Sequence, residues 1–215
     1  SFVQKFLYIF LLTLVYSTVT DFDGNVYETV QIGHQLWMGE NLKVTHYQNG
    51  DQIPSELNNE EWSTTNSGAY AVYEDNPDNS DVYGNLYNYY AVDDERGVCP
   101  EGWHIPSHQE WIDLEIHLGM TEEEANGWGW SGCRGTDEGA KLKEVGYEHW
   151  NYPNDGCICS GLDCECIEAT NESGFTALGS GERTANAYYG AQGHYEYYWT
   201  KDKYRRKLSY YMSNI

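Results

Sequence analysis

The stretch 99–118, CPEGWHIPSHQEWIDLEIHL, constrains the fold most, because a turn, a helix cap and an apolar face coincide there. Pro106 keeps the residues before it out of a helix, and Ser107 followed by Glu110 matches the S-x-x-E pattern of a capping box. Apolar residues then recur with helical spacing until Gly119 ends the run. These apolar residues are Trp111, Leu114 and Leu118. The pattern predicts a main helix at about 107–118.

We predict structural roles for the residues in and around this helix. Trp103 and Trp111 are predicted to anchor the core. The segment 103–105 is short and apolar, so we expect an extended strand that holds His104. Glu110 is expected to cap the helix. These assignments argue against a catalytic role for His104 and Glu110.

The charge of the chain limits its partners. It has 34 acidic and 12 basic residues, and its formal net charge is −22. Phosphate contacts need clustered cations, so this composition argues against a nucleic-acid partner. Only the segment 201–207, KDKYRRK, is locally basic, and we interpret it as a solvated strand or loop. An acidic surface suits divalent cations and neutral sugars, and the 20 Tyr and 8 Trp residues are typical of partly wet binding surfaces.

Residues 1–17 differ from the rest of the chain. Lys5 precedes an apolar or near-apolar run at 6–15, and Ser17 is a small residue at a plausible cleavage point. We predict a signal peptide, which makes the protein secreted, extracellular or attached to the cell surface. The alternatives are a buried strand and an N-terminal arm that packs on a neighbouring subunit. The run is too short to span a bilayer as a helix, so no integral membrane protein is expected after cleavage.

Short strands and turns dominate the remaining sequence. Asp23-Gly24 is a tight-turn pair between expected strands at 18–20 and 26–32. Residues 58–66 are expected to form a loop. Further strands are expected at 36–38, 69–73, 174–178 and within 188–199, a strand or short helix at 86–92, and helical turns after Thr121 and at 140–145. The predicted class is α+β, loop-rich, with short antiparallel sheets and one main helix.

The loop at 75–81 is rich in carboxylates and amides. Calcium takes oxygen ligands, so Asp75, Asp78 and Asp81 form a candidate calcium site. Their register does not match an EF-hand and Pro77 interrupts it, so a solvated turn is the competing interpretation. No other cofactor is expected.

Four of the six cysteines lie in the segment 157–166, CICSGLDCEC. Thiols this close can bind zinc tetrahedrally or form two disulfides. Disulfides persist in secreted proteins, so we favour them, on a hairpin that turns around Ser160-Gly161. The expected pairs are Cys157 with Cys166 and Cys159 with Cys164. Cys99 and Cys133 pair with each other, or one of them needs a partner beyond residue 215.

Aromatic residues are densest in the last third of the chain. Aromatic rings stack on the apolar faces of pyranoses, and amides and carboxylates take the hydroxyls. The candidate glycan-binding residues are Asn186, Tyr188, Tyr189, Tyr195, Tyr197, Tyr198 and Trp199. In the competing interpretation, half of them alternate inward as core.

Patterns that indicate catalysis are sparse. The chain has no glycine-rich phosphate loop and no G-x-S-x-G motif. Its seven histidines are scattered, and its carboxylates are too numerous to single out a glycosidase pair. We therefore assign no catalytic residue.

Several blocks, from about residue 18 to the end, resemble the Fibrobacter succinogenes major paralogous domain family in content and order. The blocks are TVTDFDGNVYETVQIGHQLWMGENLKVTHYQNGDQIP, GAYAVYEDN, YGNLYNYYAV, CPEGWHIPSHQEW, RGTDEGAKLKE, HWNYPN and ATNESGFTALGSGER. The resemblance implies a secreted bacterial domain at 18–215 with a C-type lectin-like fold, of a kind found in cellulose-degrading and gut-type bacteria. The block GWHIPSHQEW is also similar to the GWRLPTEAEWE block of formylglycine-generating and sulfatase-modifying proteins, which share that fold.

The sequence departs from the family pattern in three places. Members usually end in a strand resembling G-F-S-V-R-C-V, whereas this sequence stops at 213–215. The resemblance therefore implies a C-terminal truncation that removes the partner of Cys99. The cysteine segment 157–166 is an insertion, and WTKDKYRRK replaces the commoner W-S-S-T-E.

Motifs of the sequence bear on three functional classes: an enzyme, a lectin and a structural module. A formylglycine-generating enzyme needs a reactive cysteine pair late in the chain, and no cysteine follows Cys166. The Glu-Pro-Asn, Gln-Pro-Asp and Trp-Asn-Asp motifs of calcium-dependent lectins are also absent. We predict a secreted, non-catalytic bacterial surface module that acts in adhesion or in contact with a glycan such as a plant polysaccharide. The alternatives are a purely structural cell-surface or subunit-assembly module and an enzyme of the formylglycine-generating type of fold.

Overall fold

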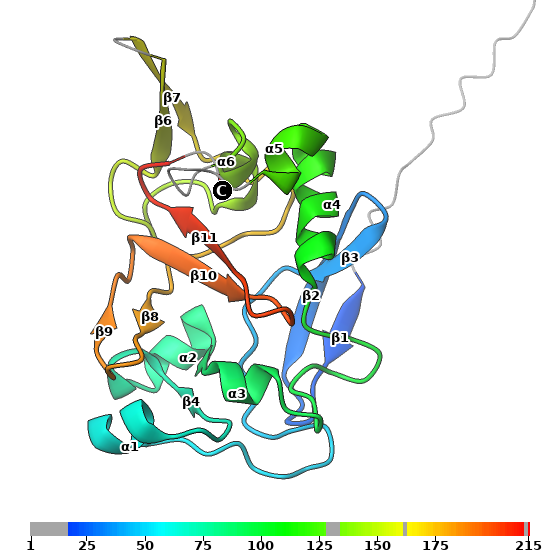
Figure 1. Ribbon diagram of the computed structural model, residues 1–215, viewed down its shortest axis with the longest axis vertical. Coiled ribbons are helices and arrows are strands. Elements are labelled where there is room, and N and C mark those ends of the chain that lie inside the picture. The colour runs from blue at the N-terminus through cyan, green and yellow to red at the C-terminus, as the bar shows by residue number, and fades with distance from the viewer. Residues whose placement is uncertain (1–16, 128–133, 161–162, 213–214) are drawn as a thin grey trace, which may run out of the picture.

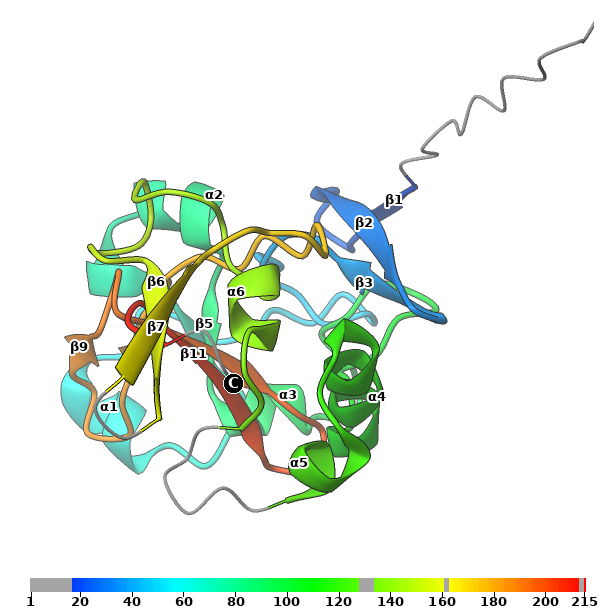
Figure 2. The same cartoon turned by 90° about the horizontal axis from the view of Figure 1, so that it is seen from above.

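The computed structural model describes residues 17–127, 134–160, 163–212 and 215, with side chains left out at 155–166. Figure 1 shows a body of short helices and strands from which the hairpin at 155–168 projects, and Figure 2 shows the same body from above. The strands are β1 (Thr18–Thr20), β2 (Val26–Ile32), β3 (Gln35–Met38), β4 (Tyr70–Ala71), β5 (Leu86–Tyr87), β6 (Asp155–Ser160), β7 (Asp163–Glu168), β8 (Glu182–Arg183), β9 (Tyr189–Gly190), β10 (Tyr195–Trp199) and β11 (Arg205–Ser209). The helices are α1 (Asn59–Thr64), a 3-10 turn η1 (Tyr73–Asp75), α2 (Asp78–Tyr83), α3 (Tyr89–Val92), α4 (His108–Leu118), α5 (Glu122–Asn126) and α6 (Glu138–Leu142).

All the sheets are antiparallel and small. β1, β2 and β3 form a three-stranded sheet, while β4–β5, β6–β7, β8–β9 and β10–β11 form two-stranded sheets. The predicted mixed class with short antiparallel sheets and one main helix is confirmed, because α4 has 11 residues and the other helices of the described chain have six or fewer. None of these helices has the length and apolar character needed to cross a membrane.

The main helix forms as its sequence predicts. The Ser107 hydroxyl accepts a hydrogen bond from the backbone N–H of Glu110 at 3.2 Å, and the Glu110 carboxylate accepts one from the backbone N–H of Ser107 at 2.7 Å. Gly119 ends the helix with a φ of 126°, a conformation that costs glycine little. The capping box therefore satisfies donors that the first helical turn leaves without partners.

Replacing Ser107 with alanine is expected to lower the free energy of unfolding by about 1 kcal/mol, because the cap is lost. Urea denaturation will measure the change. Ser63→Ala is the matched control, since Ser63 is an exposed serine inside α1, and it is expected to cost less than about 0.5 kcal/mol. Equal losses in the two variants would contradict the capping role.

One face of α4 packs on the largest core cluster. Trp111 is 1% exposed, and its ring lies 4.9 Å from Trp37 and 5.9 Å from Phe175. The predicted anchoring role of Trp111 is confirmed. Trp103 was expected to be a second core anchor, but it is half-buried, because it lies in the loop before α4 and lines a groove. The segment 103–105 is also not a strand, since no neighbouring strand pairs with it.

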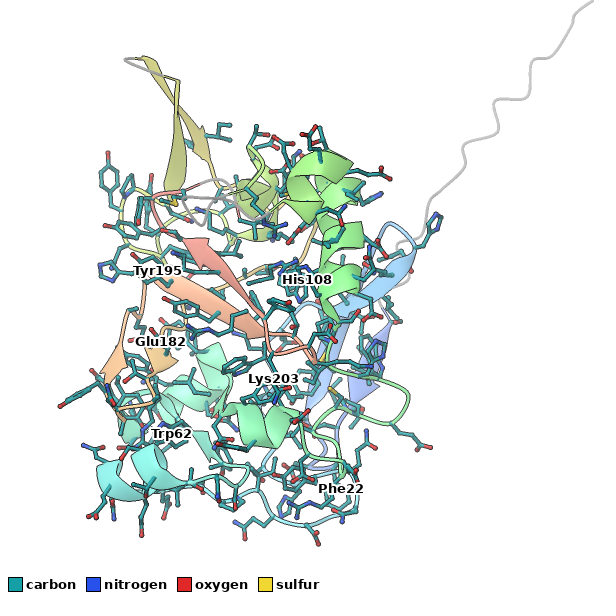
Figure 3. All side chains as sticks on the ribbon, viewed as in Figure 1. Phe22, Trp62, His108, Glu182, Tyr195 and Lys203 are labelled. Carbon is teal, nitrogen blue, oxygen red and sulfur yellow. The ribbon has the colours of Figure 1, made fainter. Side chains whose placement is uncertain are left out.

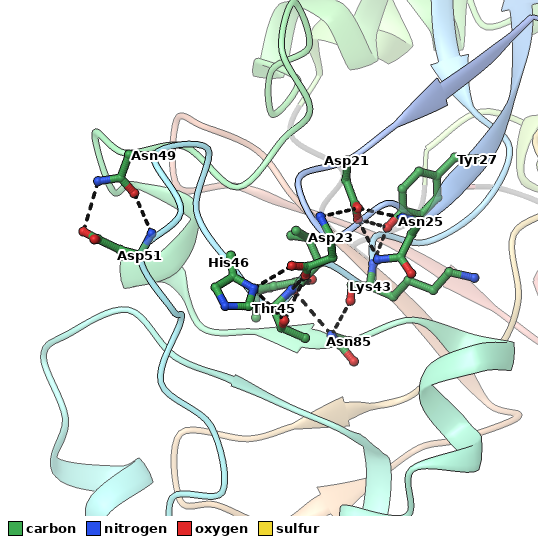
Figure 4. A network of polar contacts seen from close by, with 12 residues as sticks. Asp21, Asp23, Asn25, Tyr27, Lys43, Thr45, His46, Asn49, Asp51 and Asn85 are labelled. Atoms are coloured by element: carbon green, nitrogen blue, oxygen red, sulfur yellow. Dashed lines mark hydrogen bonds and ion pairs between the residues drawn. The ribbon is translucent and has the colours of Figure 1, made fainter.

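A polar network holds the turn between β1 and β2 (Figure 4). One oxygen of Asp21 accepts hydrogen bonds from the backbone N–H groups of Asp23 and Asn25, and the other accepts from the Tyr27 hydroxyl at 2.6 Å. The Asp23 carboxylate in turn contacts His46. The D-x-D-G-N segment is therefore a hydrogen-bonded turn, as expected, and it ties the N-terminal sheet to the following loop.

Several local expectations were wrong. Residues 58–66 contain helix α1, which the capping pair Asn58 and Glu61 starts. The segment 174–178 is no strand and has only an isolated bridge at Ala177. Within 188–199, β9 and β10 form but do not pair with each other: β9 pairs with β8, and β10 with β11. Long-range packing, which local pattern does not encode, decides these pairings.

Candidate functional site

A groove of about 1390 Å³ runs across the body of the protein. Its walls come from β3, β5, α1, α3, the loop before α4, the segment 180–186 and the β10–β11 hairpin. A concave surface lined by apolar and aromatic side chains with a few polar groups is the usual character of a ligand site. The groove is therefore the candidate site, and the hairpin supplies its aromatic wall.

The β10–β11 hairpin sorts its side chains onto two faces, because successive residues of a strand point to opposite sides. Tyr195, Tyr197 and Trp199 share one face, which we call the aromatic stripe; the rings of Tyr195 and Tyr197 lie 5.9 Å apart. Glu196 and Tyr198 point the other way, into the protein. The stripe alternates with inward residues, as the core interpretation expects for half of the predicted set, and glycan binding by the outward residues stays a prediction.

Tyr198 faces the core. Its ring lies 5.3 Å from Trp111 and 5.5 Å from Phe175. This packing joins β10 to α4 and explains why Tyr198 borders the inner side of the groove. A change at Tyr198 is therefore expected to affect stability first.

Cations of the hairpin lie over the rings of the stripe. The Arg205 guanidinium lies 4.8 Å from the centre of the Tyr197 ring and 5.5 Å from that of Trp199. The Lys207 ammonium lies 5.1 Å from the Tyr195 ring. Cross-strand pairing of Tyr197 with Lys207 and of Trp199 with Arg205 sets these neighbours. The result is a row of rings interleaved with positive charge.

The stripe continues into α3 at the turn end of the hairpin. The Trp199 ring lies 5.5 Å from that of Tyr89, edge to face, and its indole N–H donates to the Tyr87 carbonyl at 2.9 Å. The Lys203 ammonium lies 5.0 Å from the Tyr89 ring. Figure 3 shows Tyr195 and Lys203 at opposite ends of the hairpin, so rings and cations extend along its whole length.

The remaining predicted residues lie at 186–189, and of these Asn186 lines the other wall of the groove. Asn186 is exposed and lines the groove, and Tyr188 is 70% exposed on the same loop. Tyr189 is half-buried; its hydroxyl donates to Asp75 at 2.6 Å and its ring packs 5.5 Å from Tyr73. Burial and the hydrogen bond to Asp75 raise the pKa of Tyr189. Tyr189 therefore holds the wall together, whereas Asn186 and Tyr188 are accessible.

Sequence reasoning missed two side chains of this wall, Trp62 and Arg183. Arg183 is 9% exposed, and its guanidinium carbon lies 4.5 Å from the centre of the Trp62 ring and 4.9 Å from that of the Tyr189 ring. The Trp62 indole donates to the Thr184 carbonyl at 3.0 Å. The Asn58-x-x-Glu61 capping pair could have located the helix that holds Trp62. No local signal brings Arg183 to it.

A buried carboxyl lies under the aromatic wall. Glu196 is 3% exposed and accepts hydrogen bonds from the Ser180 backbone N–H at 2.7 Å and the Asn41 side-chain amide at 3.1 Å. Burial raises the pKa of Glu196 to about 8, against the lowering effect of these hydrogen bonds. The raised pKa favours the protonated, uncharged form of Glu196, which adds little negative charge to the groove.

The candidate calcium ligands are not brought together. Asp75 ends the η1 turn and accepts the Tyr189 hydroxyl, while Asp78 and Asp81 lie on α2. Within the described part of the chain, the group of metal-ligating side chains whose donor atoms lie within 4.8 Å of one another consists of Glu144, Glu148 and His149. In this group Glu144 is half-buried and Glu148 is exposed. A carboxylate oxygen of Glu144 lies 2.9 Å from Nδ1 of His149, within hydrogen-bond distance.

The cysteine insert folds into the predicted hairpin. β6 and β7 pair so that Cys157 lies opposite Cys166 and Cys159 opposite Cys164. The side chains of this hairpin and the whole of Cys133 lie outside the described residues, so the two disulfides stay a prediction. Cys99 is a free thiol in the structure, and burial raises its pKa to about 12.

Comparison with known proteins identifies the family. A search of curated proteins and a search of solved structures each found no match. The family model described as the Fibrobacter succinogenes major domain matches residues 30–214, which include the whole groove and the hairpin. The chain therefore belongs to the Fibrobacter succinogenes major domain family.

Proposed function

We propose that this chain is a secreted, non-catalytic surface module that binds a glycan chain, such as a plant polysaccharide, along the aromatic stripe, and so acts in adhesion. The observation that carries this proposal is the row formed by Tyr195, Tyr197 and Trp199 beside an open groove. Flat rings at successive outward positions of one strand suit the repeated apolar faces of a sugar polymer.

We also infer a C-type lectin-like fold and secretion of the mature chain. One main helix, several short antiparallel sheets and long connecting loops support the fold inference. The apolar run at 6–15 and the cysteine hairpin at 157–166 support secretion, because disulfides persist in oxidising compartments.

The titratable groups of the groove support a binding role over catalysis. Glu110 caps α4 and contacts the His104 ring nitrogen at 2.8 Å. Partial burial raises the pKa of Glu110, but hydrogen bonds from Ser107 and His104 outweigh it and lower the pKa below its usual value. Glu182 pairs with Arg205 at 3.1 Å. Such carboxylates position neighbouring groups. Glu196 has a raised pKa but is 3% exposed, whereas a general acid needs both a suitable pKa and access to substrate.

Pull-down on insoluble polysaccharides, with cellulose and xylan as probes, tests the proposal. Tyr197→Ala and Trp199→Ala are each expected to weaken binding about tenfold or more, because a buried aromatic contact contributes about 1–2 kcal/mol to binding. EDTA is expected to leave binding unchanged, since the stripe contains no metal ligand.

Tyr152→Ala is the matched control for these variants. Tyr152 is 78% exposed and lies outside the groove lining, so its loss is expected to leave binding unchanged. Urea denaturation of each variant separates lost binding from lost folding. No binding to any glycan, or binding indifferent to Tyr197 and Trp199, would favour the structural-module alternative.

A further inference from the structure

Most Lys and Arg side chains of this chain have a carboxylate or a backbone carbonyl as partner. The sequence has 12 Lys and Arg residues against 34 acidic ones. Among the described residues before β10, each Lys or Arg either pairs with a carboxylate or donates to backbone carbonyls. The paired ones are Lys43, Arg96, Arg134 and Lys141, and the backbone-bound ones are Lys143 and Arg183. An excess of carboxylates makes this the expected state of a cation here.

The cations of the β10–β11 hairpin are less completely paired. Its two arginines are paired with glutamates, but its three lysines are not: in the described part of the chain, no carboxylate lies within ion-pair distance of Lys201, Lys203 or Lys207. Lys201 and Lys203 are exposed and Lys207 is half-buried. Among the described residues, the lysines for which neither a carboxylate nor a backbone carbonyl lies in contact with the ammonium group are therefore gathered on the element that presents the aromatic stripe.

Two of these ammonium groups lie over half-buried aromatic rings. Lys203 is 5.0 Å from the Tyr89 ring and Lys207 is 5.1 Å from the Tyr195 ring. A ring beside a cation suits a sugar residue that carries a carboxylate, because the ring takes its apolar face and the cation takes its charge. We propose that the glycan bound by this stripe is acidic, a polysaccharide that carries uronate residues; this inference rests on the proposed function and names its ligand class.

The acidic groups near the stripe are already engaged. Glu182 pairs with Arg205, and Asp202 accepts the backbone N–H of His108 at 2.7 Å. Asp93 accepts the Tyr89 hydroxyl at 3.2 Å. None of these carboxylates lies within ion-pair distance of Lys203 or Lys207, which leaves both lysines available to an incoming carboxylate.

The charge balance also limits how acidic the ligand is. A chain of net charge −22 repels a polyanion at long range, and only a few cations on one hairpin oppose that repulsion. A polysaccharide in which uronates are interspersed among neutral sugars fits this balance better than a nucleic acid, which carries a phosphate at every unit. Rings interleaved with cations also suit single-stranded nucleic acid, so an oligonucleotide belongs in the test.

The test compares glucuronoxylan with its carboxyl-reduced form, which has the same backbone and no uronate charge, by isothermal titration and affinity electrophoresis. The protein is expected to bind glucuronoxylan roughly tenfold more tightly at low salt, and added salt should erase the preference. Lys203→Gln/Lys207→Gln is expected to reduce affinity for glucuronoxylan to that for the reduced polymer, without changing the latter. Lys43→Gln removes one charge outside the hairpin and is expected to change neither affinity.

The outcomes separate this inference from the proposed function. Equal affinity for the two polymers, or binding of neutral glycans alone, together with sensitivity to Tyr197→Ala, would overturn the acidic ligand and keep the glycan-binding function. Failure to bind any glycan would overturn the function and the inference with it. Displacement of glucuronoxylan by an equimolar single-stranded oligonucleotide would overturn the uronate ligand, because it would show that a phosphate polymer is the preferred ligand. Urea midpoints of all variants exclude unfolding as the cause.

Discussion

Replacing Glu115 with leucine is expected to lower the free energy of unfolding by about 3–5 kcal/mol, because the change leaves buried guanidinium groups without their counter-ion. Glu115 is 0% exposed on α4. One of its oxygens accepts hydrogen bonds from the Arg206 Nε at 2.5 Å and from an Arg134 Nη at 2.9 Å. The carboxylate therefore links the main helix to β11 and to the loop before α6.

The surroundings of Arg206 explain the size of this effect. Arg206 is 5% exposed, and burial lowers its pKa while the charge of Glu115 opposes that change. A second Arg206 nitrogen donates to the His108 ring at 3.1 Å, which requires that ring nitrogen to be unprotonated. Without Glu115, no carboxylate of the described residues pairs with Arg206, and its hydrogen bond to His108 offsets only part of the cost of desolvating the charge.

Urea denaturation measures the effect against a matched control. Glu123→Leu makes the same substitution at an exposed position of α5 and is expected to change stability by less than about 0.5 kcal/mol. The double variant Glu115→Leu/Arg206→Leu is expected to be more stable than Glu115→Leu alone, because the uncompensated charge is removed with its partner. A Glu115→Leu loss no larger than that of the control would show that the cluster contributes nothing.

Stability is expected to fall as pH rises from about 4.5 to about 8, and Glu196→Gln is expected to remove most of that fall. The pKa of Glu196 is raised from 4.5 to about 8 in the folded protein, first by burial. In this window the folded state keeps a proton that the unfolded state has lost. The stabilisation that Glu196 contributes is therefore complete below its pKa in the unfolded chain, and it is lost as pH rises through its pKa in the folded protein.

The expected size is on the order of 2–5 kcal/mol over the whole window, from the linkage between proton binding and folding. Urea denaturation from about pH 4.5 to pH 9 will compare the native protein, Glu196→Gln and Glu172→Gln. Glu172 is an exposed glutamate and serves as the matched control. Native and Glu196→Gln curves that run parallel across the window would refute a raised pKa at this residue.

Local features of the sequence predicted the parts of the fold that depend on near neighbours. Helix α4 follows from the cap at Ser107, the apolar spacing and Gly119, all of which act within a few residues. The cysteine hairpin follows from a turn and alternating cysteines, and its strand register was predicted correctly. Both elements form from contacts between residues close in the chain, so their patterns are complete in the sequence.

The candidate site was predicted only in part. The aromatic residues of β10 were found by composition, but which of them face the groove depends on packing: Tyr198 is inward because Trp111 and Phe175 lie beneath it. Arg183 and Trp62 were missed because they are far apart in the chain and meet only in the folded protein. Their contact has no local pattern from which to predict it.

The sequence by itself determined the family resemblance, the mixed class, the main helix and the acidic, aromatic character of the chain, because these depend on residue type and short-range spacing. The tertiary structure alone decided that β10 pairs with β11, and that Lys203 and Lys207, which have no carboxylate partner among the described residues, lie over the rings of Tyr89 and Tyr195. It also decided that Glu196 is buried with no cation of the described residues paired to it. These features arise from long-range contacts, whose free energy depends on which distant segments exclude water together.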